Sequence, residues 1–573
     1  MKVLGVHFHS HDTSVVLVDN GSVVYASSNE RFSRKKMDSG VPLLALEDCF
    51  EYCKVKPKDL DIVSITGSGD MRMFWEFMKD STLGVRLTGG KRLAMYKKPL
   101  NVLYQTIASL GVPSYLYRYF IPATRVRLAL NGFEGKYEYV AHHFCHVAAA
   151  YHTSGWDKCL VGIVEGDGYD ESTSVWHVEN GKYERYCVTR LPHSAGRFYE
   201  LITYILGFDR LKHPGKITGL AAYGDSSVCY GIIKNLLWVE GLELRMDYKR
   251  YYEWLSYYDN EKSLPKEIAR YSREDLAAAF QFRLEECVVD IIGKVVKITG
   301  ESKIALAGGV VANVKLNQRI FELDGVRQIH IQQAMGDAGL ALGAALYSSY
   351  ENGEKVNQPQ TMYLGPDYAD SEIEEILKQE GVNYERPRQL EARVARLLAE
   401  GSVVAWFDGR MEYGPRALGS RSILYQTTDK TVNDWLNKRL KRTEFMPFAP
   451  VTLEKYATKC YKNFKGAEYP ARFMTITFDC TEYMKKTCPA VVHVDNTARP
   501  QVIRRKDNPR YYKVVEEYYK ITGIPSIINT SFNMHGEPIV CTPSDAVRSF
   551  LQGNIDYMAI GSFLVSNEQN SKE

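Results

Sequence analysis

The chain has 573 residues, of which 45% are hydrophobic and 25% are charged, and its formal net charge is +3. That length is too great for one hydrophobic core, so we expect at least two domains. The near balance of charge argues against an extended nucleic-acid-binding face, although a local basic patch could still exist. No apolar run is long enough to cross a bilayer, and the first residues do not have the pattern of a secretory signal.

The 11 cysteines are scattered and include no CxxC pair. This pattern excludes a zinc ribbon and a disulfide scaffold, and it is typical of reduced, mostly buried thiols. We therefore expect a cytoplasmic protein with no membrane partner.

The N-terminal residues predict three strands. Residues 3–8 have the composition of a buried strand. Residues 14–19 and 22–27 predict two further strands joined at Asn20-Gly21, a dipeptide that strongly favours a hairpin turn.

The same pattern recurs around residue 160. Residues 160–164 predict a strand, residues 165–168 (Glu-Gly-Asp-Gly) an acidic turn, and residues 174–178 a strand that leads to a second Asn-Gly pair at 180–181. Two copies of one pattern suggest an internal duplication, which is how two-lobed α/β nucleotide-binding folds of the actin, hexokinase and Hsp70 class are built.

A polar segment at residues 350–361 contains Gly and Pro and predicts an interdomain linker. Beyond it, residues 372–399 predict a helix, a strand and a helix, and residues 403–407 predict a strand that leads into a loop rich in Gly and Arg. We therefore expect two domains, residues 1–358 and residues 359–573.

His142 and His146 are four residues apart in a segment of good helix formers. This spacing places both imidazoles on one helical face, as a divalent metal ion requires of two ligands from one helix. The alternative is two helix histidines that face solvent or core. Carboxylates would complete the site, and the candidates are Glu165 or Asp167, and Asp337, each of which could instead form a turn or cap a helix.

Residues 306–310 predict a strand that ends in Gly308-Gly309, with Asn313 shortly before a helix. Paired glycines let a phosphate or an adenosine approach the backbone, and the helix N-terminus supplies N–H donors. Together with the glycine-rich segment 213–224, these residues favour a nucleotide-binding cleft.

Four clusters in the second expected domain combine Gly or Pro with basic and hydrogen-bonding residues. Their members are Arg416, Arg421, Lys441, Arg442, Arg499, Asn529 and Ser531. Guanidinium groups together with neutral donors are suited to phosphate and carboxyl-like groups. For any single Arg an ion-paired surface is the alternative, but the recurrence predicts an anion-binding pocket.

A histidine cluster occupies the first predicted polar turn, with His7, His9, His11 and Asp12. His11 beside Asp12 would face the same cleft as the metal, which makes a general-base role credible, whereas an isolated histidine is more often structural. Lys36 lies in a basic run that either is solvated or contacts a phosphate.

Three motifs carry a family resemblance: His-His-x-x-His at 142–146, Gly-Pro-Arg-Ala-Leu-Gly at 414–419 and Pro-Phe-Ala-Pro at 447–450. With them the chain resembles the O-carbamoyltransferases of the NodU/CmcH/TobZ family, which modify nodulation factors, cephems and aminoglycosides. The resemblance extends over nearly the whole length. It implies an N-terminal duplicated actin-like (ASKHA) domain and a C-terminal YrdC-like α/β domain.

The resemblance also implies an activity. The YrdC-like domain would take carbamoyl phosphate and ATP with Mg²⁺ and form carbamoyl-adenylate. The N-terminal domain, with a divalent ion such as Fe²⁺, would pass the carbamoyl group to a hydroxyl of a small natural-product or sugar acceptor. The runner-up is a tRNA-modifying enzyme that transfers a threonylcarbamoyl group, against which the near-neutral charge speaks. A kinase on the actin-like fold would need neither the histidine pair nor the Arg clusters.

Roles follow from matching residues to the family. The implied metal ligands are His142, His146, Asp337 and Glu165, which stands where the family usually has Asp, so that Asp167 is the alternative. The implied catalytic and substrate-binding residues are His11, Lys36, Arg416, Lys441, Arg499 and Asn529.

Two positions depart from the family. Met446 stands where an Arg often precedes Pro-Phe-Ala-Pro, and Arg442 could supply the lost charge. His9 stands where some relatives have an acid that contacts the acceptor, so we expect a less cationic acceptor than an aminoglycoside. A homodimer remains an open expectation.

Overall fold

The computed structural model describes all residues except 9, 68–125, 442–444 and 568–573. The chain forms two compact units. Unit 1 comprises Met1–Thr153 and Asp337–Pro359, and unit 2 comprises Ser154–Gly336 and Gln360–Glu573. Among the helices of the described ranges, none has the length and apolar character needed to cross a membrane.

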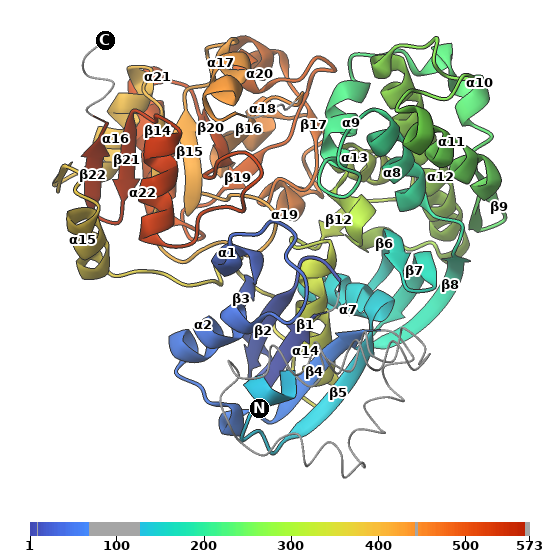
Figure 1. The fold of residues 1–573 in the computed structure, drawn as a ribbon, viewed down its shortest axis with the longest axis horizontal. Coiled ribbons are helices and arrows are strands. Elements are labelled where there is room, and N and C mark those ends of the chain that lie inside the picture. Colours follow the sequence, from blue (N-terminus) through green and yellow to red (C-terminus); the bar gives the residue numbers. More distant parts are fainter. Residues whose placement is uncertain (9, 68–125, 442–444, 568–573) are drawn as a thin grey trace. The chain divides into compact units, whose positions relative to one another are not determined.

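Unit 1 is built on a five-stranded sheet in the order β3-β2-β1-β4-β5 (Figure 1). Its strands are β1 (Lys2–His7), β2 (Ser14–Asp19), β3 (Ser22–Ser28), β4 (Ile62–Gly67) and β5 (Lys136–Ala141). β1, β2 and β3 pair antiparallel, whereas β1, β4 and β5 are parallel. Asn20 and Gly21 both have positive φ, 47° and 71°, as a two-residue hairpin turn requires. The predicted hairpin is confirmed.

Unit 1 also contains helices, and one of them, α14, makes close backbone contacts. They are α1 (Glu30–Ser33), α2 (Leu43–Cys53), α7 (His142–Ser154) and α14 (Leu340–Glu351). Gly5 on β1 allows α14 to approach, since a Cβ there would lie 2.1 Å from the carbonyl oxygen of Ala341. Gly343 in α14 likewise meets the carbonyl oxygen of Cys145 in α7, at 1.9 Å from the position of a Cβ. The two glycines fix α14 between the sheet and α7.

The segment predicted as a linker is partly helical and is held against unit 1. α14 extends to Glu351, and the N–H of Asn357 donates to the carbonyl oxygen of Gly21 at 2.8 Å. A Cβ at Gly21 would lie 2.0 Å from the carbonyl oxygen of Lys355. The first hairpin therefore anchors this polar stretch of chain.

The first sheet of unit 2 repeats the pattern of unit 1, in the order β12-β11-β6-β7-β8. Its strands are β6 (Lys158–Gly168), β7 (Glu171–Glu179), β8 (Lys182–Arg190), β11 (Lys303–Ala307) and β12 (Gln328–Ile331). β6, β7 and β8 are antiparallel, and β6, β11 and β12 are parallel. The internal duplication and the actin-like α/β class predicted from the sequence are confirmed by this topology.

The acidic turn predicted at residues 165–168 was the wrong local structure. These residues continue β6, and the pairing of β6 with β7 shifts register between Val164 and Gly168. A bulge inserts residues into one strand without ending it, so the glycines mark an irregularity at the end of a strand and not a turn.

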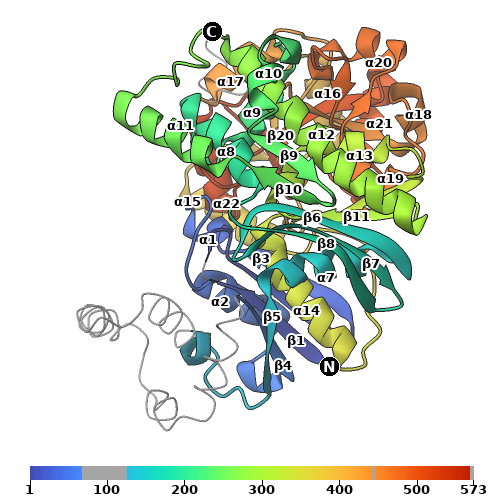
Figure 2. The ribbon, with the colours of Figure 1, turned by 90° about the vertical axis from the view of Figure 1, so that its right-hand side faces the viewer.

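Helices α8 (Ala195–Ile205) and α12 (Arg273–Thr299) bury the apolar core of this sheet (Figure 2). Phe198 of α8 and Phe280 of α12 stack with ring centroids 4.6 Å apart. The other elements of this part are α9 (Pro214–Ala221), α10 (Tyr230–Ile233), β9 (Leu237–Glu240), β10 (Glu243–Met246), α11 (Tyr248–Glu261) and α13 (Val314–Phe321).

The rest of unit 2 is a mixed eight-stranded sheet in the order β13-β22-β21-β14-β15-β20-β16-β19. Its strands are β13 (Tyr384–Glu385), β14 (Val404–Phe407), β15 (Arg421–Tyr425), β16 (Ala449–Leu453), β19 (Gln501–Ile503), β20 (Ser526–Ser531), β21 (Tyr557–Ile560) and β22 (Phe563–Ser566). A two-stranded sheet adds β17 (Phe478–Asp479) and β18 (Thr497–Ala498).

The helices of this part are α15 (Asp370–Gln379), α16 (Leu390–Ala399), α17 (Val432–Arg439), α18 (Ala457–Cys460), α19 (Glu468–Ala471), α20 (Glu482–Thr487), α21 (Pro509–Thr522) and α22 (Pro543–Gln552). The predicted order of helix, strand and helix over residues 372–399 is confirmed by α15, β13 and α16. The α/β class predicted for the C-terminal part is confirmed as well.

α13 connects the two parts of unit 2 through buried polar contacts. The side-chain amide of Asn317 donates to the carbonyl oxygens of Val311 and Thr475, both at 2.7 Å. Nζ of Lys315 lies 3.0 Å from a carboxylate oxygen of Asp495. Asn317 has no exposed surface, so its two bonds are shielded from competing water, whereas the Lys315–Asp495 pair is partly exposed.

Candidate functional site

The histidines predicted as metal ligands meet Asp337 at the start of α7. His142 and His146 are 4% and 1% exposed, and their Nε2 atoms lie 3.7 Å and 3.8 Å from Oδ1 of Asp337. Each of these residues offers a ligand atom within 4.8 Å of the others. Two atoms that each bind a metal at about 2.1 Å are at most about 4.2 Å apart. Each histidine therefore lies close enough to Asp337 to share one divalent ion with it.

The charge states of these groups suit a metal. Burial raises the pKa of Asp337, but the electrostatic effect of the neighbouring imidazoles, that of His142 foremost, outweighs it and holds the pKa below its usual value. Burial lowers the pKa of His7 beside this group to about 3. An ionised carboxylate with two imidazoles is a common donor set for zinc and for non-haem iron.

A second layer of hydrogen bonds lies behind Asp337. The Ser10 hydroxyl donates to Oδ2 of Asp337 at 2.7 Å. Nε2 of His7 lies 3.0 Å from Oγ of Ser10, and Nδ1 of His7 lies 2.7 Å from Oγ1 of Thr66. Sequence reasoning missed Ser10 and Thr66. Ser10 could have been found because it lies among the histidines of the first turn, whereas Thr66 is brought in only by the pairing of β1 with β4.

His11 is the half-exposed member of this group. Its Nδ1 lies 3.0 Å from Oδ2 of Asp12, which orients the imidazole ring. Lys36 lies exposed in the loop that follows α1. His9, predicted to face the acceptor, lies outside the described residues.

Glu165 and Asp167 were the alternatives for a further acidic ligand, and the two side chains differ in exposure and in ion pairing. Asp167 is 43% exposed, and its carboxylate lies 2.7 Å from an Nη atom of Arg197. Glu165 is buried on β6. A ligand carboxylate should be shielded from solvent and not held by an arginine, so Glu165 remains the predicted fourth ligand.

The Gly308-Gly309 pair follows β11 as predicted, and the two glycines differ. Gly308 has φ of 102°, and a Cβ there would lie 2.4 Å from the carbonyl oxygen of Val164, so packing alone requires this glycine. At Gly309 no described atom lies within 4 Å of a Cβ position. Asn313 caps α13 by accepting from the N–H of Leu316, and its amide also bonds to Gln281. Gly309 is thus the position that a ligand can approach.

The loop between β14 and β15 carries the predicted Arg416 and is folded around a buried carboxylate. Oε1 of Glu412 accepts from the backbone N–H groups of Leu418, Ser420 and Arg421, at 2.7, 3.3 and 3.2 Å. Sequence reasoning missed Glu412, which lies two residues before the Gly-Pro-Arg-Ala-Leu-Gly motif. Its bonds close the loop and leave Arg416 half-buried at the surface of the unit.

Arg421, predicted to bind an anion, has a different place. It has no exposed surface, and one Nη donates to the carbonyl oxygens of Asp408, Gly409 and Ser420. Its guanidinium carbon lies 3.7 Å from the ring centre of Phe407. These contacts are those of a residue that holds loops in place, so we reassign Arg421 from ligand binding to support of the loop.

Three predicted clusters are joined at Asn529 on β20. The amide nitrogen of Asn529 donates to the carbonyl oxygen of Ala417 at 3.1 Å and to Oε1 of Gln501 at 2.7 Å. Nε2 of Gln501 donates to the carbonyl oxygen of Leu418 at 2.6 Å. These bonds bring Arg416, one residue before Ala417, into the same region as Arg499, two residues before Gln501.

The remaining predicted residues of this region are placed as follows. Ser531 ends β20, and Lys441 is exposed just after α17 with φ of 56°. Arg442 lies outside the described residues. Met446, which stands where relatives often have Arg, packs on Gly219 of α9, where a Cβ would lie 2.8 Å from its Cγ. An apolar contact therefore occupies that position.

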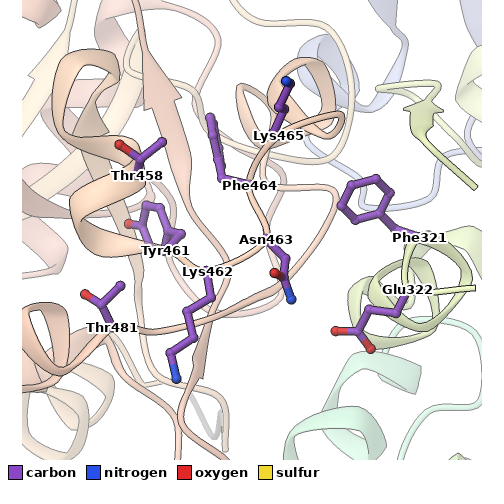
Figure 3. Close-up of a pocket in the computed structure, with 9 residues that line it drawn as sticks. All are labelled: Phe321, Glu322, Thr458, Tyr461, Lys462, Asn463, Phe464, Lys465 and Thr481. Carbon is purple, nitrogen blue, oxygen red and sulfur yellow. The ribbon is translucent and has the colours of Figure 1, made fainter.

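Unit 2 also has a groove of about 800 Å³ that is separate from these residues (Figure 3). It is lined by Phe321, Glu322, Thr458, Tyr461, Lys462, Asn463, Phe464, Lys465 and Thr481. None of the predicted site residues lines it.

Comparison with known proteins decides the family. A family model described as the carbamoyltransferase N-terminus matches residues 2–346, and one described as the carbamoyltransferase C-terminus matches residues 395–567. The chain belongs to the carbamoyltransferase family. The resemblance drawn from the motifs is therefore confirmed, and the protein is a carbamoyltransferase.

Relatives of this carbamoyltransferase cover nearly its whole length. Nodulation protein NolNO of Sinorhizobium fredii is 32% identical over 98% of this chain and 80% of its own. The uncharacterized protein sll1178 of Synechocystis sp. is 31% identical over 98% of this chain and 96% of its own. Among solved structures, T. kodakarensis HypF has 12% identity and a TM-score of 0.35, covering 62% of this chain and 48% of its own.

Proposed function

We propose that the protein transfers the carbamoyl group of carbamoyl phosphate to a hydroxyl of a small-molecule acceptor, with ATP as the activating substrate. The observation that carries this proposal is the junction at Asn529, which unites the loops of Arg416 and Arg499. Two guanidinium groups suit a phosphate. We further propose that residues 359–573 activate the carbamoyl group and that residues 1–358 transfer it, as predicted from the sequence.

A buried acceptor atom supports carbamoyl phosphate as the ligand. Oδ1 of Asn529 is buried and has no hydrogen-bond partner among the described residues. Leaving such an acceptor unsatisfied costs about 1–3 kcal/mol. The –NH₂ of a carbamoyl group can donate to it while the phosphate faces Arg416 and Arg499. Lys441 and Ser531 are proposed as further contacts to the phosphates.

The proposed first reaction consumes carbamoyl phosphate and ATP. Water releases phosphate from carbamoyl phosphate and leaves carbamate. A carbamate oxygen then forms a bond to the α-phosphorus of ATP, and pyrophosphate leaves with the electron pair. Gly309 is proposed to approach the phosphate of the product, carbamoyl-adenylate, because its backbone is free of a side chain. Lys36 is kept as a separate candidate for a phosphate contact.

In the proposed second reaction the acceptor hydroxyl attacks the carbonyl carbon, and AMP leaves. His11 accepts the hydroxyl proton, and Asp12 at its Nδ1 stabilises the resulting imidazolium. His142, His146 and Asp337 would hold a divalent ion, with Glu165 proposed as the fourth ligand and Fe²⁺ as the ion. When bound, such an ion offsets negative charge and orients the adenylate.

The test is release of pyrophosphate from ATP that depends on carbamoyl phosphate, measured without acceptor. We expect Arg416→Ala to lower this release about 100-fold, because a charged donor to the phosphate is lost. Lys465→Ala, which removes a cation from the groove in the same unit, should retain the wild-type rate. Pyrophosphate release that is equal in Arg416→Ala and wild type would overturn the assignment of this pocket.

A further inference from the structure

A chain of hydrogen bonds runs from the β4 strand to the metal-ligand carboxylate. It begins at Thr66 and passes through His7 and Ser10 to Asp337. Thr66 and His7 are almost completely buried, and Asp337 is 9% exposed. The heavy-atom distances along this chain are 2.7 Å from Thr66 to His7, 3.0 Å from His7 to Ser10 and 2.7 Å from Ser10 to Asp337, which are those of well-formed hydrogen bonds.

The chemistry of the groups fixes the direction of the chain. Nε2 of His7 lies within 3.4 Å of the carbonyl oxygen of His11, and a carbonyl can only accept. Nε2 therefore carries the hydrogen and also donates to Ser10 at 3.0 Å. In a neutral ring Nδ1 is then the acceptor, so the Thr66 hydroxyl donates to it.

Ser10 has one hydrogen to give. Its hydroxyl lies 2.7 Å from Oδ2 of Asp337 and 3.2 Å from the carbonyl oxygen of His11. The carboxylate is the nearer acceptor and the charged one, so it takes the hydrogen. Oδ2 of Asp337 is thereby occupied, while Oδ1 is the oxygen that faces both His142 and His146.

We infer that Ser10, held by His7 and Thr66, is a positioning residue that makes Asp337 a one-oxygen ligand of the metal ion. This inference rests on the metal site of the proposed function. Without the bond to Ser10, the carboxylate can rotate and offer either oxygen or both. Loss of such an outer hydrogen bond typically weakens metal binding 10- to 100-fold, about the effect expected here.

Ser10 also ties the carboxylate to the turn that carries His11. This tie runs through His7, whose Nε2 donates to Ser10 and also lies 3.4 Å from the carbonyl oxygen of His11. A change at Ser10 should therefore move the proposed base together with the ligand. A purely structural serine would have no such joint effect on metal binding and on turnover.

The test uses the full chain and Co²⁺ as the probe. Metal affinity is measured by titration, and the visible spectrum of bound Co²⁺ reports its coordination. The variants are Ser10→Ala, Ser10→Thr as the conservative replacement, and Ser14→Ala as the matched control. Ser14 is a buried serine whose hydroxyl donates at 2.8 Å to the carbonyl oxygen of Ala338, next to the ligand, and not to its carboxylate.

We expect Ser10→Ala to bind Co²⁺ about 10- to 100-fold more weakly with an altered spectrum, and Ser10→Thr and Ser14→Ala to stay within about threefold of wild type. Equal affinity and spectrum in Ser10→Ala and wild type would overturn the inference. An equal loss of Co²⁺ affinity in Ser14→Ala would overturn it too, because the effect would then come from the backbone around Asp337 and not from the bond to its carboxylate. A wild-type chain that binds no Co²⁺ would instead overturn the metal site itself.

Discussion

The two candidate sites are built in different ways. In unit 1 the proposed metal ligands come from the start of α7 and from a short 3-10 helix, Asp337–Gly339, and Ser10 and His7 form a second layer of hydrogen bonds behind Asp337. In unit 2 the proposed anion-binding residues Arg416 and Arg499 lie outside the strands, and the buried side chains of Glu412 and Arg421 hold the backbone near Arg416 in shape. The proposed ligands of the first site contact one another directly, whereas the shape of the second site depends on buried residues outside the proposed pocket.

The largest effect that sharpens this comparison is expected in unit 1. Asp337→Asn keeps the shape of the side chain but removes the charge that two histidines face. We expect metal affinity to fall more than about 100-fold, with carbamoyl transfer lost in parallel. Titration with Co²⁺ and product formation would measure both. His143→Gln, a buried neighbour on α7 outside the ligand group, is the control. Retained metal binding in Asp337→Asn would break the assignment.

The second prediction compares Arg416 in the β14–β15 loop with Arg421 at the start of β15. Arg421→Ala removes a fully buried side chain together with its bonds to three carbonyl oxygens and its packing on Phe407, and it should lower the free energy of unfolding by about 3 kcal/mol or more. Arg416→Ala should change the unfolding free energy by less than about 1 kcal/mol, although it abolishes most of the first reaction. Urea denaturation followed by circular dichroism measures both. Similar destabilisation by the two variants would remove the distinction between ligand and support.

The third prediction concerns Glu412. Glu412→Gln replaces charge-assisted bonds to three backbone N–H groups by weaker neutral ones. We expect a loss of about 1–2 kcal/mol in unfolding free energy and a rise of KM for carbamoyl phosphate with little change of kcat. Steady-state pyrophosphate release gives the two constants. A lowered kcat at unchanged KM would mean that Glu412 takes part in the reaction itself.

The fourth prediction is a pH dependence of stability, which is absent at neutral pH. Burial lowers the pKa of His330 in unit 2 to about 3. The unfolded chain, with a histidine pKa of about 6.5, takes up the proton first, so the stabilising contribution of the neutral ring is complete above about pH 6.5 and is lost as the pH falls. Each pH unit below that costs about 1.4 kcal/mol. His330→Gln should flatten this loss in urea denaturation between about pH 7 and pH 5. An unchanged pH profile would contradict it.

Much of the fold was predictable because it rests on local patterns. The Asn-Gly hairpin turns, and the placement of His142 and His146 on one helix, each follow from a few neighbouring residues. The continuation of β6 through Glu165 was not predictable, because a bulge and a turn use the same acidic and glycine residues.

The limits at the site have a similar cause. Arg421 and Arg416 look alike in sequence. Only the packing of Phe407 and the β14–β15 loop shows that Arg421 is buried and supports the loop, whereas Arg416 is half-buried. Thr66 contributes through strand pairing across many residues, which no local pattern reports. Groups that act through another residue are therefore the ones that sequence reasoning misses.

The contacts of α13 have a consequence for how such a gene can be divided. Cutting the chain between the two family segments, in the stretch of residues 347–394, would strip Asn317 of the carbonyl oxygen of Thr475 and Lys315 of Asp495. A C-terminal fragment expressed alone would in turn expose the surface that α13 covers. Recombination that exchanged one half for that of a relative would need a matching α13, so the two halves are expected to be inherited and engineered as a pair.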